Sequence, residues 1–313
     1  LYADDTIIFA ESAEGLQKAL DVFEQYCFEW KLTVNVTKTK IVIFSKRKYN
    51  KNVTFKLCNE IIEIKDSYVY LGLLFNYNGN FFQARKKLVD QAQKALYALY
   101  KKIQNISLPI DLQLKLFDAL VVPILTYSSE IWGFENKNNT EKLHLQFCKR
   151  SLGVRSSTPN FMVYGELGRF PLELQIKLKM VCFWHKLATN DKKLSGKLYK
   201  LLWYMHEHEG SNFKWFNYVK SVFNDCGFCE LYNFPEQVDY NYIKINVRQR
   251  LQDQFIQKWF SDINNSSRGE FYLHFKEEFC LETYLLKLRR GHRVNICKLR
   301  VCNTKFPIET GRW

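Results

Sequence analysis

The chain has 313 residues, of which 47% are hydrophobic and 16% aromatic, so it can bury a sizeable core and is not a disordered chain. No apolar run approaches the roughly 18 residues that cross a bilayer, and nine cysteines without a secretory signal argue against a disulfide framework. We expect an intracellular protein, nuclear or cytoplasmic, with two or more domains and no membrane contact.

The net charge of +14 is unevenly distributed along the chain. Residues 1–80 contain ten Lys or Arg and ten Asp or Glu, whereas residues 81–160 contain twelve and six. The rest of the excess lies in residues 161–313. A basic body of this kind fits a polyanionic partner, most often nucleic acid. Charge alone equally fits a helical interaction protein whose surface charge is incidental.

The first 80 residues have the pattern of a small β-rich piece with one helix. Thr6–Phe9 is β-branched and aromatic and directly follows two aspartates, which predicts the second strand of a hairpin. Ser12 can cap a following helix whose apolar residues, from Leu16 to Trp30, share one face. Further strands are expected at residues 41–44, 53–57, 61–64 and 68–75.

After residue 80 the pattern changes to helical periodicity. Residues 82–104 and 110–122 predict two helices, separated by Ser107-Leu108-Pro109. Amphipathic helical stretches then continue to about residue 260. Short polar breaks fall near residues 134–140, 153–160, 207–213, 233–239 and 262–269. We therefore expect an α+β protein in which a β-rich piece precedes a long helical body.

The chemically most informative segment is the carboxylate pair Asp4-Asp5. Two adjacent carboxylates at the tip of a hairpin cannot both be buried without a cation beside them. Their oxygens suit a hard ion such as Mg²⁺, and two such ions about 3.5–4 Å apart can hold the attacking and leaving oxygens of a phosphoryl transfer. The alternative is a solvated Asp-Asp turn.

Three motifs in order resemble the palm of reverse transcriptases. Tyr2-Ala3-Asp4-Asp5 resembles the YADD box, and the segment from Trp30 to Lys40 resembles the next palm motif of non-LTR elements, with the core Asn-x-x-Lys-Thr-Lys. Tyr70-Leu71-Gly72 resembles the primer-grip hairpin that follows. The chain is therefore identified as the C-terminal fragment, from the YADD box onward, of a non-LTR (LINE-type) retrotransposon reverse transcriptase.

The resemblance continues beyond the palm and implies a domain organisation. Residues 125–133 resemble a Tyr-x-x-Glu-x-Trp-Gly segment of the thumb, and residues 164–172 resemble a stretch that follows it. The fold class implied is α+β: a partial palm of short antiparallel strands plus a helix, then a mainly helical thumb and C-terminal region. The predicted domains are residues 1–80 for the palm with catalytic hairpin and primer grip, 81–160 for the thumb and 161–313 for the C-terminal region.

The resemblance also implies roles for individual residues in the parent polymerase. Asp4 and Asp5 would be the catalytic and metal-binding residues for Mg²⁺ or Mn²⁺. Lys38 and Lys40 would lie beside the nucleotide, where a lysine can neutralise charge on the pyrophosphate leaving group; the alternative is two exposed turn lysines. RNA template, DNA primer and dNTP would be the partners. The primer-binding residues would be Tyr2, Tyr70, Leu71 and Gly72.

Lysines repeat at helical spacing in the first thumb helix. Lys87, Lys94 and Lys101 recur every seven residues and so share a face, which we interpret as phosphate contacts to a primer–template duplex. A solvated helix face is the alternative. The same two interpretations apply to a basic string near the C-terminus, which comprises Lys287, Arg289, Arg290, Arg293, Lys298 and Arg300.

Two further expectations concern zinc and activity. Cys226 and Cys229 have Cys-x-x-Cys spacing but no second pair at a standard spacing, so we do not expect a zinc site there. The resemblance places the fingers and a further metal-binding aspartate before Leu1, so we expect the isolated chain to be inactive. The alternative function is a non-catalytic nucleic-acid-binding remnant of a retrotransposon. The sequence does not indicate an oligomeric state.

Overall fold

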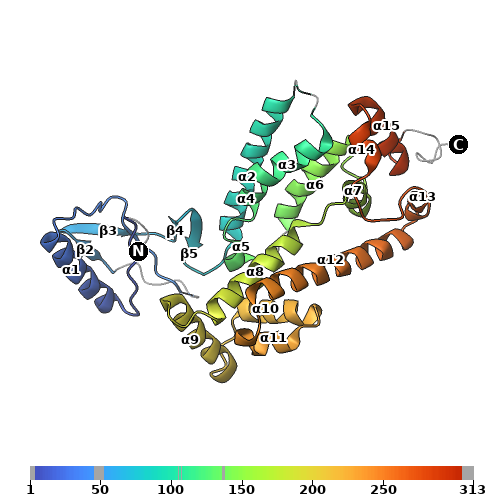
Figure 1. Cartoon of the computed structure of the whole chain (residues 1–313). Coiled ribbons are helices and arrows are strands. Elements are labelled where there is room, and N and C mark those ends of the chain that lie inside the picture. The colour runs from blue at the N-terminus through green and yellow to red at the C-terminus, as the bar shows by residue number, and fades with distance from the viewer. Residues whose placement is uncertain (1–3, 46–52, 105, 107, 136–137, 305–313) are drawn as a thin grey trace. The chain divides into compact units, whose positions relative to one another are not determined.

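The computed structural model describes residues 4–45, 53–104, 106, 108–135 and 138–304. The chain divides into two compact units, Leu1–Ala84 and Arg85–Trp313 (Figure 1). Short strands and one long helix make up the first unit, and the second is helical, which confirms the predicted α+β class. The assignment of palm, thumb and C-terminal region to residues 1–80, 81–160 and 161–313 stays a prediction.

In the first unit, one helix packs on a small sheet. The helix α1 (Ala13–Glu29) begins where the Ser12 side chain accepts a hydrogen bond from the Gly15 amide at 3.0 Å, as its N-cap position predicts. The sheet has the strand order β1-β3-β2, with β1 parallel and β2 antiparallel to β3. These strands are β1 (Lys40–Ile41), β2 (Phe55–Leu57) and β3 (Glu60–Ile64). The core between helix and sheet contains Leu20, Ile41, Phe55, Leu57 and Ile62.

The side chain of Gln17 ties α1 to the outer edge of β2. Its Nε2 donates to the Lys56 carbonyl at 2.9 Å, and its Oε1 accepts from the Lys56 amide at 3.0 Å. An amide side chain thereby occupies backbone groups that a neighbouring strand would otherwise pair with.

The apolar run at residues 68–75 forms a hairpin rather than a single strand. Its strands are β4 (Ser67–Tyr70) and β5 (Leu73–Asn76), which pair antiparallel. Leu71 and Gly72 form the turn with φ of 47° and 81°. Positive φ at both central residues is the geometry that lets a two-residue turn follow the twist of the strands. The single strand predicted from composition was therefore wrong, whereas the hairpin that the resemblance implied is present, with Gly72 in its turn.

Two other strand predictions were wrong or too long. Thr6–Phe9 forms no strand, because no described segment provides the ladder hydrogen bonds that a strand shares with a neighbour. Phe9 is consequently 83% exposed. Of the strand predicted at residues 41–44, only Ile41 pairs, in β1.

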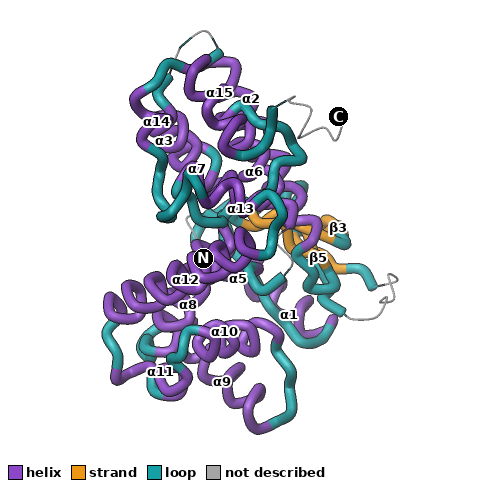
Figure 2. The backbone as a smooth tube through the Cα atoms, turned by 90° about the vertical axis from the view of Figure 1, so that its right-hand side faces the viewer, coloured by secondary structure: helices purple, strands orange, loops and turns teal. Residues whose placement is uncertain are grey.

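The second unit is built from helices, shown as the purple tube in Figure 2. The helices predicted at 82–104 and 110–122 are confirmed as α2 (Phe82–Ile103) and α3 (Ile110–Leu120). Each predicted break lies at or near the boundary between two α-helices, although the break at residues 233–239 also contains a short 3-10 helix. The remaining helices are α4 (Val122–Leu125), α5 (Ser129–Trp132), α6 (Asn138–Leu152), α7 (Asn160–Leu167), α8 (Leu172–Ala188), α9 (Leu194–His208), α10 (Lys214–Asp225), α11 (Cys229–Asn233), η1 (Pro235–Gln237), α12 (Tyr240–Asn264), α13 (Gly269–Leu273), α14 (Thr283–Lys287) and α15 (Arg290–Arg300).

Two hydrophobic clusters fill this unit, and the long helices α8 and α12 contribute to both. Leu172 and Trp259 belong to the cluster around α2, α3, α6 and α7, whereas Met180 and Ile243 belong to the cluster around α9, α10 and α11. The order of these residues shows that α8 and α12 run antiparallel, side by side (Figures 1 and 2). The pair therefore connects the two clusters into one unit.

In residues 125–133, which resemble a thumb motif, Trp132 and Gly133 are required by the packing of the helices. Trp132 is completely buried, and its Nε1 donates to the Tyr127 carbonyl at 2.8 Å. Gly133 lies so close to α8 that an added Cβ would come within 2.5 Å of Ile176 and 2.8 Å of Met180. Only glycine fits between these side chains without displacing them.

Replacement of this glycine gives a test of the packing. We expect Gly133→Ala to lower the free energy of unfolding by about 2 kcal/mol, because a methyl group must be forced into a filled core. Gly291→Ala is the matched control: nothing lies within 4 Å of its Cβ position, so we expect a change within about 0.5 kcal/mol. Urea denaturation of both variants measures this difference, and equal stabilities would contradict the packing described.

Candidate functional site

Asp4 and Asp5 are both exposed at the start of the described chain. Carboxylate oxygens open to water are suitable donors for a hard divalent ion that retains part of its hydration shell. Within the described residues, no group of three or more His, Cys, Asp or Glu side chains is placed to hold a metal. The donor chemistry therefore fits such an ion, although the pair forms only part of a ligand set. Tyr2 lies outside the described residues.

Asn35 organises the turn that carries the two candidate nucleotide lysines. Its Oδ1 accepts hydrogen bonds from the Thr37 hydroxyl at 2.7 Å and from the Lys38 amide at 3.1 Å. Its carbonyl accepts from the Thr39 amide at 3.1 Å and the Thr39 hydroxyl at 2.9 Å. Such side-chain-to-backbone bonds are the usual reason for asparagine in a turn. The sequence motif contains Asn35, but its role is visible only in the structure.

The two lysines of this turn have different environments. Lys40 Nζ donates to the Thr37 carbonyl at 2.6 Å and lies 3.2 Å from a Glu63 carboxylate oxygen, with only 15% of its side chain exposed. The hydrogen bond from Lys40 holds the pKa of Glu63 below its usual range. Lys38, in contrast, has an exposed side chain. Lys38 is therefore accessible to an incoming anion, whereas Lys40 already has internal partners.

The β4–β5 hairpin lies next to this turn. The Tyr68 hydroxyl donates to the Lys38 carbonyl at 3.2 Å, so the structure brings two of the predicted motifs together. At the tip of the hairpin Gly72 is exposed, Leu71 is 38% exposed, and Tyr70 is half-buried. The three predicted primer-binding residues in the hairpin are thus at or beside an accessible turn.

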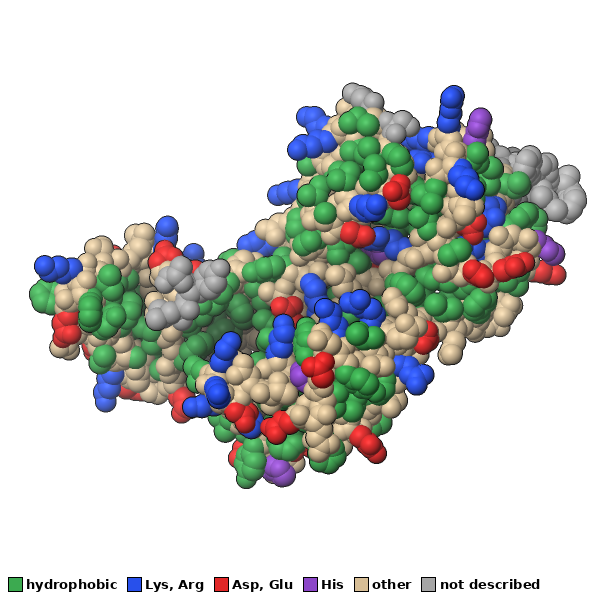
Figure 3. Space-filling model, in the orientation of Figure 1, with side chains coloured by type: hydrophobic (Ala, Val, Ile, Leu, Met, Phe, Trp, Pro, Cys, Tyr) green, Lys and Arg blue, Asp and Glu red, His purple; other side chains and the backbone are tan. Residues whose placement is uncertain are grey.

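The lysines of α2 lie on the surface of the second unit. Lys87, Lys94 and Lys101 are all exposed, and the opposite face of the helix is buried through Ala92 and Leu96. Figure 3 shows Lys and Arg side chains along the edge of this unit where α2 lies. The helix therefore has the amphipathic arrangement that its sequence predicted.

The basic string near the C-terminus is only partly a surface feature. Arg293 is 5% exposed and donates to the Leu108 carbonyl at 3.4 Å. The Arg300 guanidinium contacts both carboxylate oxygens of Glu166, at 3.0 and 3.1 Å. The interpretation of the whole string as nucleic-acid contacts, or as a solvated face, was therefore wrong for these two arginines. Both have partners in distant parts of the sequence, which charge spacing does not reveal.

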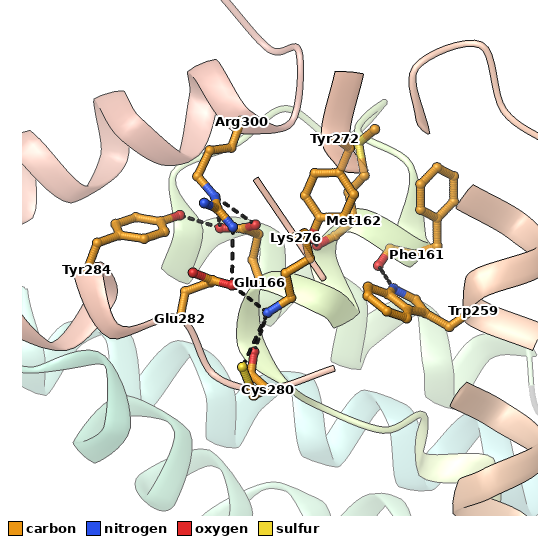
Figure 4. Close-up of polar contacts among 10 residues, drawn as sticks. All are labelled: Phe161, Met162, Glu166, Trp259, Tyr272, Lys276, Cys280, Glu282, Tyr284 and Arg300. Carbon is orange, nitrogen blue, oxygen red and sulfur yellow. Dashed lines mark hydrogen bonds and ion pairs between the residues drawn. The ribbon is translucent and has the colours of Figure 1, made fainter. Parts of the chain in front are cut away.

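Glu166 is the centre of a buried polar network that joins α7 to the C-terminal helices (Figure 4). Besides Arg300, its carboxylate accepts a hydrogen bond from the Tyr284 hydroxyl. Arg300 also contacts Glu282 at 3.1 Å, and Glu282 in turn accepts from the buried Lys276. Burial raises the pKa of Glu166, although Arg300 and Tyr284 act against that shift. This network was not predicted from the sequence.

A second polar cluster joins residues 164–172, the stretch that contains Glu166, to Glu141 and His144 of α6. Glu141 accepts from the Tyr164 hydroxyl at 2.6 Å and from the Leu172 amide at 2.8 Å, and its carboxylate lies 2.6 Å from His144 Nδ1. Burial alone would raise the pKa of Glu141, but these hydrogen bonds lower it. Arg169 contacts the His144 ring, so the stretch that resembles a region after the thumb is here a packing element.

Three other expectations concern zinc, the membrane and the cellular compartment. Of the two cysteines with Cys-x-x-Cys spacing, Cys226 is buried and Cys229 is exposed. Among the helices of the described residues, none is both long and apolar enough to cross a membrane. Neither observation tests the compartment, which stays a prediction.

The comparisons with known proteins agree with the motifs. Residues 1–75 match the family described as reverse transcriptase (RNA-dependent DNA polymerase). A transposon-derived protein of Caenorhabditis elegans is 29% identical over 161 residues, which are 49% of this chain and 56% of that protein. The RNA-directed DNA polymerase from mobile element jockey of Drosophila melanogaster is 23% identical over 179 residues, 54% of this chain and 19% of that protein. No solved structure matches the chain.

The motifs and these relatives together define the class of protein. The small unit of strands and one helix that contains the Asp-Asp pair matches the reverse-transcriptase family over residues 1–75. The predicted resemblance to the reverse transcriptases of non-LTR retrotransposons is confirmed, and at the level of the family the chain is related to RNA-directed DNA polymerases. The chain spans little more than half of the first relative and about a fifth of the second.

Two substitutions of Asn35 test whether its side-chain oxygen organises the turn. We expect Asn35→Ala to remove about 1 kcal/mol of local stability, because the Thr37 hydroxyl loses its acceptor and the Lys38 amide keeps only the weaker bond to the carbonyl of residue 35, at 3.2 Å. Amide hydrogen exchange of Lys38 should then be about fivefold faster. Asn35→Asp keeps an oxygen at the same place and is the matched control, for which we expect little change. Equal exchange rates in all three proteins would show that the side chain does not organise the turn.

The buried carboxylate of Glu166 gives a second test. Glu166→Gln keeps an oxygen that accepts from Tyr284 but removes the charge that faces Arg300, so it should cost about 1–3 kcal/mol of unfolding free energy. Glu166→Ala should cost about 3–5 kcal/mol, since Arg300 and Tyr284 lose their acceptor inside the protein. Glu173→Gln, in the exposed pair with Lys177, is the control and should change stability by less than about 1 kcal/mol. A stable Glu166→Ala variant in urea denaturation would contradict this account.

Proposed function

We propose that this chain contributes the catalytic aspartates, the primer grip and the duplex-holding helices of an RNA-directed DNA polymerase. The observation that carries the proposal is the contact between the Asn35–Lys40 turn and the β4–β5 hairpin, through Tyr68 and the Lys38 carbonyl. Both elements lie in the segment that matches the reverse transcriptases. This contact joins the segment that carries the exposed Lys38 to the base of the hairpin, in a unit that also contains the Asp-Asp pair, and so supports the proposal that these motifs act together.

Asp4 and Asp5 are proposed as metal ligands. Divalent ions bound by such carboxylates stabilise charge on the attacking and leaving oxygens of a phosphoryl transfer, and Mg²⁺ is the expected ion. Asp4 and Asp5 supply negative oxygens that are accessible to solvent and therefore to a nucleotide as well. Because they are two ligands of a larger set, we expect a polypeptide of these 313 residues to bind Mg²⁺ weakly.

Lys38, rather than Lys40, is proposed to face the leaving group. Lys38 can present its charge to a triphosphate because its side chain is exposed, whereas the charge of Lys40 is already matched by the Glu63 carboxylate. Asn35 then acts as a positioning residue, since it fixes the backbone from which Lys38 extends. The primer end is proposed to lie at the hairpin tip, where Gly72 has no side chain to keep the strand away.

The lysine face of α2 is proposed to hold the primer–template duplex. Lys87, Lys94 and Lys101 are exposed and recur at seven residues, about 10.5 Å along a helix. Such lysines contact phosphates and position a duplex without reading its sequence. Contacts of this kind depend on charge, so the effect of this surface on binding should weaken with salt.

Primer extension on an RNA template tests the proposal. We expect no extension by the 313-residue polypeptide alone, and Mg²⁺-dependent extension when it is produced with the upstream reading frame of its gene. In that longer protein, Asp4→Asn should abolish the activity, because an amide replaces a charged ligand. Lys38→Gln should reduce kcat about 10²-fold or more, whereas Lys40→Gln should have a smaller effect.

The outcomes distinguish the two functions considered. Extension by the 313-residue polypeptide would refute the expectation of inactivity. An inactive longer protein that still binds an RNA–DNA hybrid in a salt-sensitive way would indicate a non-catalytic nucleic-acid-binding remnant. A longer protein whose Asp4→Asn variant stays fully active would exclude Asp4 as a metal ligand.

A further inference from the structure

One face of α6 carries a cluster of cations that the sequence analysis did not single out. Lys142, Gln146, Lys149 and Arg150 recur at helical spacing, so they share one side of the helix. The opposite side packs into the core through residues such as Phe147, which is 1% exposed. In the sequence, only the helical spacing of Lys142, Lys149 and Arg150 indicates this cluster, and the same spacing is common on helix faces that merely contact water.

This face lines a concavity of about 610 Å³. Its other wall is the connection to α7 and the start of that helix. None of the described lining residues is acidic, and the nearest carboxylate along α6, Glu141, already accepts hydrogen bonds from Tyr164 and the Leu172 amide. The polar residues that line it are Lys142, Gln146, Lys149, Arg150, Ser156 and Asn160.

Two of the three cations are held in place. Lys149 Nζ donates to the Ser156 carbonyl at 2.6 Å, and the partial burial of this ammonium lowers its pKa. The Arg150 guanidinium lies 4.0 Å above the centre of the Tyr100 ring. A cation that is positioned in advance loses less conformational entropy when it binds an anion. Asn160 begins α7, and the amides of a first helical turn also favour negative charge.

The concavity is connected with the lysine face of α2 through aromatic residues. Tyr100, which supports Arg150, directly precedes Lys101, and Tyr97 lies one helical turn before both. Tyr97 is 50% exposed. Cations with exposed aromatic rings between them are the composition of surfaces that bind nucleic-acid strands.

We propose that this concavity is a second phosphate-binding site, which takes a phosphodiester backbone of nucleic acid beyond the α2 lysine face. The proposal rests on the proposed function, because it takes nucleic acid as the partner. Lys142, Lys149 and Arg150 contact the phosphates, and Ser156 and Asn160 provide neutral hydrogen-bonding groups. A site of this kind increases affinity without selecting a sequence.

The salt dependence of binding tests the site. Dissociation constants for a short fluorescein-labelled RNA–DNA hybrid are measured by anisotropy at about 50 and about 200 mM salt for the 313-residue chain and its variants. Removing two phosphate contacts in Lys142→Gln/Arg150→Gln should reduce the ratio of the two constants about tenfold. Thermal unfolding of each variant verifies that it is folded. The single variant Arg150→Lys keeps the charge and should therefore retain most of the salt dependence of the unsubstituted chain.

Two further variants separate this proposal from the previous one. Lys192→Gln/Lys193→Gln removes the same charge from exposed lysines before α9 and should leave the ratio unchanged; an equal reduction there would overturn the proposal. Lys87→Gln/Lys94→Gln/Lys101→Gln tests the α2 face. If only the α2 variant reduces the ratio, the second site is refuted and the proposed function stands. If the unsubstituted chain binds the hybrid without salt dependence, both fail.

Discussion

The carboxylate of Glu166 is completely buried in the second unit, and side chains of the C-terminal helices donate the hydrogen bonds that it accepts there. A buried carboxylate without hydrogen bonds would cost several kcal/mol. Arg300 of α15 and Tyr284 of α14 supply those hydrogen bonds from residues more than a hundred positions away in the sequence. The chain therefore cannot place α7 in the core unless the C-terminal helices close over it.

The glycines beside Glu166 make this closure sterically feasible. A Cβ at Gly165 would come within 2.8 Å of the Trp259 ring, and Gly168, with φ of 54°, lies against the backbone of Cys280 and Leu281. The first allows α12 to approach α7, and the second ends α7 in the left-handed conformation. Trp259 also shares a hydrophobic cluster with residues of α2 and α3. Residues on both sides of position 160 thus fold around a common core, whatever their separate roles in a polymerase.

Sequence patterns predicted the parts of this structure that depend on near neighbours. The amphipathic spacing in α1 was sufficient because one helix face, with Leu20 and Cys27, becomes buried. Thr6–Phe9 has the composition of a strand, but composition does not provide a pairing partner. The composition of the apolar run did not reveal the turn at Leu71 and Gly72, because only the glycine marks it, and the hairpin was expected from the motif resemblance alone. The environment of Arg300 depends on Glu166, and no local pattern connects them.

The same distinction explains why charge predicted a class of partner but not the residues that would contact it. Each internal ion pair, such as Lys40 with Glu63 or Arg300 with Glu166, removes one positive and one negative group from those available to a ligand. Pairing therefore leaves the net excess of +14 unchanged and concentrates it on the remaining exposed cations. Composition can count that excess, but only the fold shows that Lys38 and Lys142 are among the exposed lysines while Lys40 is not. Because Lys and Arg outnumber Asp and Glu by fourteen, at least fourteen cations have no carboxylate to pair with, and the fold decides which of them lie close enough together to act on one polyanion.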